Sequence, residues 1–147
     1  DSRDTVGGMA HGFAIGVNNS GNWEASIYAN DGTGVLVAAG AAPLSSVTHV
    51  VLTFDGTNAA IFINGMQMSA PTAVPGGTTF SPNTTSPFVI GAGLPWLPPR
   101  MQGGPDLSFP LLPFKGTIQD VAFYNTVLSD ADITKHFEDG SGKTMVS

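Results

Sequence analysis

The stretch of residues 48–68, THVVLTFDGTNAAIFINGMQM, constrains the fold of this chain more than any other part of the sequence. Its first half places apolar residues at the two-residue period of a β-strand, at Val50, Leu52 and Phe54. A turn cluster at 55–58 separates this half from a second apolar run at 60–63, and Asn64-Gly65 is the dipeptide most typical of a tight hairpin turn. The pattern predicts an antiparallel ribbon at the centre of the molecule.

The composition favours a sandwich of short strands over a helical protein. Glycine and proline, 19 and 11 of 147 residues, make up about a fifth of the chain, as in sheet proteins with many turns. A net charge of −6, with only five lysine and arginine residues and no basic run, disfavours a nucleic-acid partner. The absence of cysteine excludes disulfides and thiolate zinc sites, and no run of about 18 apolar residues exists to span a membrane.

Alternating apolar residues predict further strands on both sides of the central ribbon. The expected strands lie at 12–17, 23–29, 35–39, 88–92 and 114–124, with turns at 18–22 and 30–34. Residues 1–11 are expected to form a loop or a fraying strand, and residues 69–87 a loop with one edge strand. Six prolines in 94–113 exclude a central strand there, because proline has no N–H to donate to a sheet ladder.

A short helix is expected near the C-terminal end. Ser129 is the predicted N-cap, and Asp132, three residues later, completes a capping box. Apolar and aromatic residues then recur at helical spacing, at Ile133, His136 and Phe137. Gly140 is expected to close the helix. The pattern predicts one domain over residues 1–140 and a flexible tail over residues 141–147.

Four stretches of the sequence carry a resemblance to a known family. They are residues 48–56, 61–65 (IFING), 88–91 (FVIG) and 114–125 (FKGTIQDVAFYN), the last followed by a Leu-Ser helix start at 128–129. In order and spacing over residues 12–138, they resemble the laminin-G-like group of concanavalin A-like jelly rolls. The resemblance implies an all-β, two-sheet antiparallel jelly-roll sandwich with one short C-terminal helix.

The chain departs from the family pattern in two places. Val47-Thr48 stands where the family often has tryptophan. Such domains also usually begin with two or three strands before the one expected at 12–17, and here these are absent or compressed into residues 1–11. We therefore expect the domain to lack its first strands, which a parent polypeptide or a partner supplies.

Catalysis is disfavoured by the scarcity of glutamate. The glucanase relatives of this fold use paired carboxylates on one strand, because retaining hydrolysis needs an acid and a nucleophile a few ångströms apart. The only two glutamates, Glu24 and Glu138, are each isolated, and no Gly-x-Ser-x-Gly nucleophile motif occurs. We expect no enzyme, and the remaining catalytic interpretation is an accessory module of a glycoside hydrolase.

Calcium is the one metal that the resemblance implies, since laminin-G-like domains often hold Ca²⁺ with aspartates and backbone carbonyls. Asp55 and Asp120 are the candidate ligands. Asp55 has an alternative role as a turn residue. Asp120 interrupts an apolar run, so it either faces solvent or pairs with Arg3, Arg100 or a backbone donor.

Carbohydrate binding is predicted from the long proline-rich loop. Aromatic rings stack on the apolar faces of sugars while polar side chains bond the hydroxyls, and loops commonly carry binding residues. The candidate ligand-binding residues in this loop are Trp96, Arg100, Asp106 and Phe109. The alternative is that the loop folds back as a lid over the core. Trp23 and Tyr28 lie on a predicted strand, where Trp23 is better explained as a core residue.

The sequence as a whole predicts a non-catalytic recognition or adhesion module that binds carbohydrate in an extracellular or virion-surface protein. The expected partners are a glycan or a protein surface. The alternative is a structural assembly domain of the capsid-decoration, tail or surface-layer kind, which uses its apolar proline-rich loops to contact copies of itself or its parent polypeptide.

Overall fold

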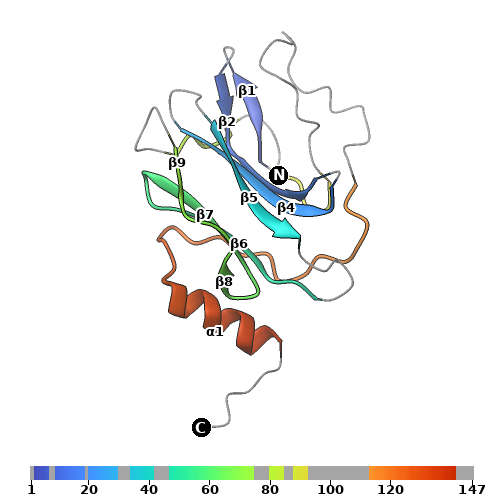
Figure 1. Ribbon diagram of the computed structural model, residues 1–147. Helices are drawn as coiled ribbons and strands as arrows, with labels where there is room; N and C mark the ends of the chain where they lie inside the picture. Colours follow the sequence, from blue (N-terminus) through green and yellow to red (C-terminus); the bar gives the residue numbers. More distant parts are fainter. Residues whose placement is uncertain are drawn as a thin grey trace.

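The structure is a computed structural model that describes residues 2–6, 9–18, 20–29, 34–41, 47–74, 80–84, 88–92 and 113–141. This part of the chain is mostly antiparallel sheet with one helix, which confirms the predicted fold class (Figure 1). The elements are β1 (Asp4–Val6), β2 (Met9–His11), β3 (Phe13–Val17), β4 (Asn22–Tyr28), β5 (Gly34–Ala41), β6 (Val50–Phe54), β7 (Asn58–Ile63), β8 (Met66–Gln67), β9 (Thr72–Ala73) and α1 (Asp130–Gly140). The predicted turn at 30–34, save Gly34, and the predicted tail beyond 141 lie outside the described residues.

The central ribbon is confirmed. β6 pairs with β7 in a register that runs from Val50 opposite Ile63 to Phe54 opposite Ala59, and β8 and β9 pair with β7 on its other side. The turn between β7 and β8 places both Asn64 and Gly65 in the left-handed region, with φ of 52° and 80°. Two successive left-handed residues are what a two-residue hairpin turn requires, which explains the Asn-Gly sequence.

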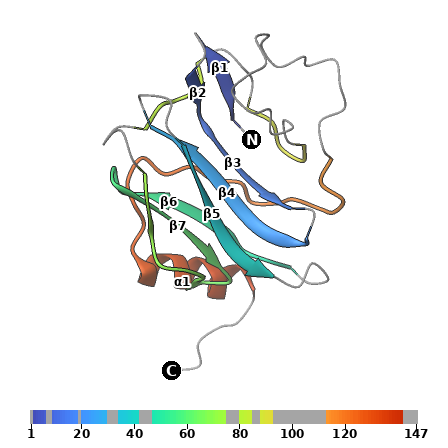
Figure 2. The same cartoon turned by 45° about the horizontal axis from the view of Figure 1, so that its top comes forward.

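A three-stranded sheet in the order β3-β4-β5 packs across this ribbon (Figure 2). Its strands correspond to the three predicted before the ribbon, and the turn predicted at 18–22 is closed by backbone hydrogen bonds between Asn18 and Asn22 and between Gly21 and Asn18. The inward side chains of both sheets form one buried cluster, made of Ala25, Ile27, Ala29, Val37, Ala39, Ala59, Ile61, Ile63 and Val74. Trp23 packs against this cluster, so the core role predicted for it is confirmed.

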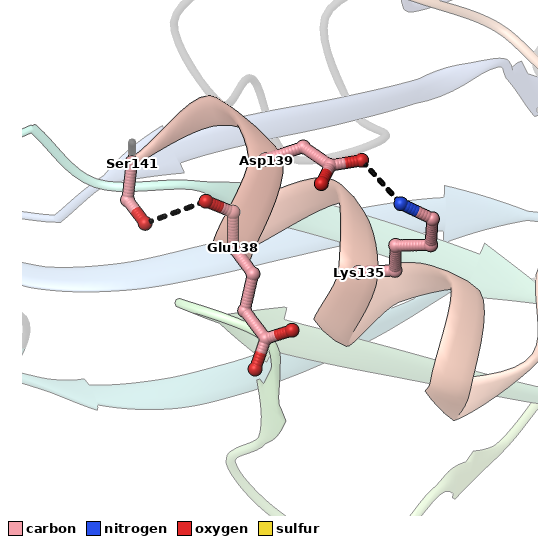
Figure 3. Close-up of polar contacts among 4 residues, drawn as sticks. All are labelled: Lys135, Glu138, Asp139 and Ser141. Atoms are coloured by element: carbon pink, nitrogen blue, oxygen red, sulfur yellow. Dashed lines mark hydrogen bonds and ion pairs between the residues drawn. The ribbon is translucent and has the colours of Figure 1, made fainter. Parts of the chain in front are cut away.

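The helix α1 covers the opposite face of β7. Fully buried Ile133 packs on Ala60 and Phe62 in a second cluster. The capping box is confirmed, because the Ser129 hydroxyl accepts a hydrogen bond from the Asp132 N–H at 3.2 Å while the Asp132 carboxylate accepts one from the Ser129 N–H. The C-terminal end differs from the expectation: the cap is Ser141 in a right-handed conformation, and its hydroxyl donates to the Glu138 carbonyl (Figure 3).

Two predicted strands are wrong. Residues 88–92 form no strand, because Gly91 has a φ of 82° that leaves the extended region, and Ile90 is 56% exposed. Residues 114–124 form no strand either: Asp120 has a φ of 55°, and Phe123 is 62% exposed. In place of a ladder, the described residues show an isolated bridge between Ala92 and Pro113 and a hydrogen bond of 2.8 Å from the Phe114 N–H to the Gly91 carbonyl.

Beyond the hydrogen bond of Phe114, aromatic rings attach the 114–124 segment to the rest of the structure. The ring of Phe123 contacts Phe88 edge-on at a centroid distance of 4.9 Å and Phe13 at 5.8 Å, and Phe114 lies 6.0 Å from Trp23. Alternation of apolar residues is necessary for a strand but does not supply a neighbour with which to pair. The segment is therefore anchored mainly by its aromatic side chains, and its backbone between them is irregular.

Residues 1–11 differ from the expectation, whereas the segment 69–87 agrees with it in the part that the structure describes. Residues 1–11, expected as a loop or a single strand, contain the two-stranded sheet β1-β2, with Asp4 opposite His11. The segment predicted as a loop with an edge strand contributes β9, which pairs with β7, and an isolated bridge between Ala29 and Phe80. No helix in the described part of the chain is long and apolar enough to cross a membrane.

Replacing Ile133 by alanine tests whether α1 is part of the folded unit. Because Ile133 is fully buried between the helix and β7, we expect Ile133→Ala to lower the free energy of unfolding by about 3 kcal/mol. Val127, which is 51% exposed just before the helix, provides the control. Val127→Ala should change the free energy of unfolding by less than about 0.5 kcal/mol. Urea unfolding measures both, and equal small effects would show that the helix is not docked.

Candidate functional site

The four loop residues predicted to bind carbohydrate lie outside the described residues. Trp96, Arg100, Asp106 and Phe109 all fall in the stretch between Ala92 and Pro113. Their role in binding a ligand therefore remains a prediction.

The two predicted calcium ligands occupy different settings. Asp55 closes the turn between β6 and β7: its Oδ1 accepts hydrogen bonds from the N–H groups of Asn58 at 2.6 Å and Thr57 at 2.7 Å. These bonds hold the pKa of the Asp55 carboxyl below its usual value, the Asn58 bond contributing most. Asp120 is exposed on the irregular segment. Among the described residues, no three His, Asp or Glu side chains gather as a metal group, so calcium binding remains a prediction for both.

Polar side chains also lie on the outer face of the β3-β4-β5 sheet, called the outer face below. Strand alternation places Glu24, Ser26 and Tyr28 of β4 on this face, opposite the core-facing Ala25 and Ile27. Glu24 and Tyr28 are partly exposed, whereas Ser26 between them is buried. Mostly small residues flank them. In register, these neighbours are Ala14 and Gly16 on β3, and Gly34, Leu36 and Ala38 on β5.

Tyr28 lies flat against its neighbouring strand. Gly34 is its partner on β5, and a Cβ built on Gly34 would overlap the Tyr28 ring, so the ring occupies the space that a side chain would take. An aromatic ring laid over a cross-strand glycine is a recurrent way to stabilise a sheet. The Tyr28 side chain remains partly exposed, so it also offers an aromatic surface on the outer face.

Glu24 is held at the other end of the outer face. Its Oε2 accepts a hydrogen bond of 3.0 Å from the Asn18 side chain. The Asn18 Oδ1 in turn accepts from the backbone N–H groups of Ser20 and Asn22, at 2.9 and 3.1 Å, which fixes the amide in the β3–β4 turn. A Cβ built on Gly16, the β3 partner of Glu24, would meet no atom within 4 Å. Open space therefore adjoins the carboxylate.

Arg3 reaches the outer face because the chain crosses over Gly12. Gly12 has a φ of 87°, and a Cβ on it would overlap the Ser2 carbonyl oxygen and lie 3.1 Å from the Arg3 Cα. The Ser2 N–H donates to the Phe13 carbonyl at 2.8 Å, which fixes this crossing. Burial lowers the pKa of the Arg3 guanidinium, and electrostatic interactions with Tyr28 and Glu24 partly offset that effect.

The arrangement suits binding better than hydrolysis. The two residues paired with Glu24, Gly16 and Ala38, carry no acid, and Glu138 lies away on α1. Retaining and inverting hydrolysis both need a second carboxyl group across the scissile bond. The outer face combines an aromatic side chain with a carboxylate, an amide and a guanidinium, which are the kinds of group that contact polar ligands with apolar faces.

The sequence predicts only part of this surface. Tyr28 is an aromatic residue on a predicted strand, whereas no motif marks Glu24 or Asn18 as a ligand contact. The signal was present in the alternation, since Glu24 and Tyr28 have the opposite parity to Trp23 and Ile27. The placement of Arg3 depends on the crossing over Gly12, a long-range contact that sequence periodicity does not reveal.

Two histidines beside α1 form a second titratable cluster. The His49 ring stacks on Phe137 at 6.3 Å, and the His136 ring lies 5.8 Å from Tyr124. The backbone N–H of His49 donates to the Asn64 side chain at 2.9 Å, so His49 also braces the β7–β8 turn. Its buried Nδ1 has no hydrogen-bond partner among the residues that the structure describes. Burial, with a smaller effect from His136, lowers the pKa of His49 below its usual 6.5.

The His49 pKa predicts how stability changes with pH. Unfolding restores the usual pKa, so near pH 6 the unfolded chain binds a proton that the folded protein does not. The free energy of unfolding should therefore be highest above pH 6.5, and it should fall as pH drops through the lowered pKa. Urea unfolding at several pH values between about 8 and 5 measures how steeply the free energy of unfolding changes with pH. His49→Gln should reduce this slope. An unchanged slope would assign the effect to other groups.

Gly12→Ala tests the chain crossing that places Arg3. The new Cβ would overlap the Ser2 backbone and the left-handed φ would strain alanine, so we expect a loss of at least about 1–2 kcal/mol in the free energy of unfolding. Gly40→Ala is the matched control, because a Cβ there meets nothing within 4 Å and the φ is not left-handed. Urea unfolding compares the two, and equal stability would show that the crossing does not form.

Comparison with known proteins agrees with this architecture. A family model described as the concanavalin A-like lectin/glucanases superfamily, of the laminin G type, matches residues 1–134. No curated protein and no solved structure matches the chain. The matched family includes both binding and hydrolytic proteins by its description, so it specifies the fold and a binding type of module rather than a ligand. With nearly the whole chain matched and two antiparallel sheets facing each other, the protein is a laminin G-like member of the concanavalin A-like superfamily.

Proposed function

We propose that this protein is a non-catalytic recognition module that binds carbohydrate through the outer face of its three-stranded sheet. The observation that carries the proposal is the partly exposed Tyr28 ring, fixed over Gly34 on the same face as the Glu24 carboxylate. Membership of a superfamily described by its lectins and glucanases supports the same kind of ligand.

The side chains of the outer face are complementary to the chemical groups of a sugar. A pyranose ring has an apolar face of C–H groups and a rim of hydroxyls, so it stacks on an aromatic ring while donating hydrogen bonds to a carboxylate. Glu24 is held by Asn18 and needs little reorganisation to accept such bonds. The predicted loop residues Trp96, Arg100, Asp106 and Phe109 are proposed as a second contact region, and calcium at Asp55 or Asp120 as an optional ligand.

The proposed setting is an extracellular or virion surface, where a glycan is the partner. The isolated position of Glu24 supports a non-catalytic role, because no acid faces it on either neighbouring strand. The low content of charged side chains, 11% of the sequence, is compatible with recognition through stacking and hydroxyl contacts.

A glycan array, probed with and without calcium, tests the proposal. The protein should retain at least one class of glycan, and Tyr28→Ala should weaken that binding by about thirtyfold, since truncating a central aromatic contact commonly costs about 2 kcal/mol. Tyr28→Phe is the matched control, because it keeps the stacking ring, and Trp96→Ala tests the loop in parallel. Melting temperatures of all variants separate lost binding from lost folding. No retained glycan under either condition would oppose the proposal.

A second candidate function is structural assembly through apolar surface. The segments on either side of the proline-rich loop expose large apolar side chains: Ile90, Ile118, Val121, Phe123 and Val127 are 42–62% exposed. Exposed apolar groups gathered in this way commonly mark contacts between proteins.

The molecular mass in solution distinguishes structural assembly from carbohydrate binding by a monomer. If the apolar residues join copies of the chain, light scattering should give a mass above 15.1 kDa that rises with concentration, and Val121→Lys should lower it. Ala38→Lys, on the outer face, is the control for added charge and should leave the mass unchanged. A single monomeric mass at all concentrations would oppose assembly.

A further inference from the structure

We propose that the open edge of β3 binds an extended segment of a partner protein, which adds to the three-stranded sheet as an antiparallel strand in the register that Ser2 sets. β3 forms one margin of this sheet (Figure 2). Addition of a strand to a sheet edge is a recurrent mode of peptide recognition, in which main-chain hydrogen bonds supply the affinity. The edge is distinct from the outer face, so this interaction is independent of carbohydrate binding.

The hydrogen bonds at the two ends of β3 fix which of its residues bond to β4. The Tyr28 N–H donates to the Gly12 carbonyl at 3.1 Å, and the Asn18 N–H donates to the Asn22 carbonyl at 2.9 Å. Hydrogen-bonded pairs recur at every second residue of an antiparallel ladder. The even-numbered residues of β3 therefore direct their backbone groups toward β4, and the odd-numbered residues direct theirs toward the other edge.

Two of the three odd-numbered residues leave their backbone groups unpaired at this edge. The Phe13 carbonyl accepts a hydrogen bond of 2.8 Å from the Ser2 N–H. Among the described residues, no hydrogen bond joins the outward N–H and C=O groups of Ile15 or Val17. The strand has the sequence FAIGV, without charge or proline. Such an edge is open to pairing with a further strand.

Ser2 sets the register that a further strand would take. β1 pairs with β2 in a register whose continuation places Ser2 opposite Phe13, where the hydrogen bond between them is found. A segment placed end to end with Ser2, on its N-terminal side, would run antiparallel to β3. Its residues would lie opposite Ile15 and Val17 and would complete their hydrogen bonds.

A partner's segment fits this edge better than a second copy of β3 does. An antiparallel pairing of two β3 edges would bring Val17 or the β3–β4 turn of one copy opposite Phe13 of the other. Ser2 already lies there and donates to the Phe13 carbonyl. A segment that ends where Ser2 begins avoids this overlap.

The side chains along the edge define the chemistry of the partner segment. Ile15 packs against the main buried cluster, and Val17 has the same parity, whereas Gly16 between them faces outward. Directly opposed residues of an antiparallel pair lie on the same face. The segment should therefore carry apolar residues opposite Ile15 and Val17 and a polar residue between them. The net charge of −6 favours a segment that is neutral or basic.

NMR titration of the isotope-labelled protein with a synthetic peptide, acetyl-KVTVSVK-amide, tests the proposal. Without the peptide, the Ile15 and Val17 amides should exchange with solvent at least about tenfold faster than the Ala14 and Gly16 amides, which bond to β4. With the peptide, the Ile15 and Val17 amides should become protected. The dissociation constant should be about 1 mM or lower, because up to four main-chain hydrogen bonds form.

Two controls test whether the peptide binds as a strand at this edge. The peptide acetyl-KVVVTSK-amide has the same composition without the alternation, and it should bind at least about tenfold more weakly. Val17→Pro removes an N–H that β4 does not use, so it should keep the fold and weaken binding of the alternating peptide at least about tenfold. Melting curves confirm folding, and the comparison of the two peptides decides the question if Val17→Pro does not fold.

The pattern of protected amides decides whether the strand adds to β3. New protection of Ile15 and Val17 by the alternating peptide supports the proposal. Protection of Leu52 in β6 in place of Ile15 would overturn it, as would equal binding of both peptides. The absence of any new protection at peptide concentrations up to about 5 mM would also overturn it.

Discussion

Burial of β7 on both faces is the interaction on which the rest of the structure depends. One face, through Ala59 and Ile61, meets the inward side chains of β4 and β5, and the other, through Phe62, meets Ile133 of the helix. Six of the nine residues in the main cluster are alanine or valine, namely Ala25, Ala29, Val37, Ala39, Ala59 and Val74. Small side chains let two sheets approach closely, so packing rather than hydrogen bonding joins the layers.

The central ribbon and the helix were predictable because their signals are local. The Asp55 side chain closes its turn within three residues, Asn64 and Gly65 take the left-handed conformations that their types favour, and the Ser129–Asp132 box begins the helix. The segment 114–124 was mispredicted because a strand also needs a partner. Its apolar alternation is real, but Asp120 turns the backbone out of the extended region, and no spacing rule reveals that.

The outer face shows why the candidate site was only half visible in the sequence. Strand alternation puts Glu24 and Tyr28 on the face opposite to the core-facing Ile27, where both side chains are partly exposed. Parity does not show that the ring of Tyr28 rests on Gly34, nor that Arg3 arrives over Gly12 from the start of the chain. These placements depend on tertiary contacts between segments that are distant in sequence.

The second edge of strand β6 bears on the tendency of the protein to aggregate. In the described part of the chain it pairs only with β7, so the N–H and C=O groups along its second edge have no sheet partner. Its sequence, VVLTF, has high β-propensity and neither charge nor proline, the composition typical of segments that stack into amyloid. We therefore expect fibrils that form during long storage at high concentration to begin along Val50–Phe54. A lysine substituted in this strand should slow fibril growth, because its charge opposes the stacking of strands.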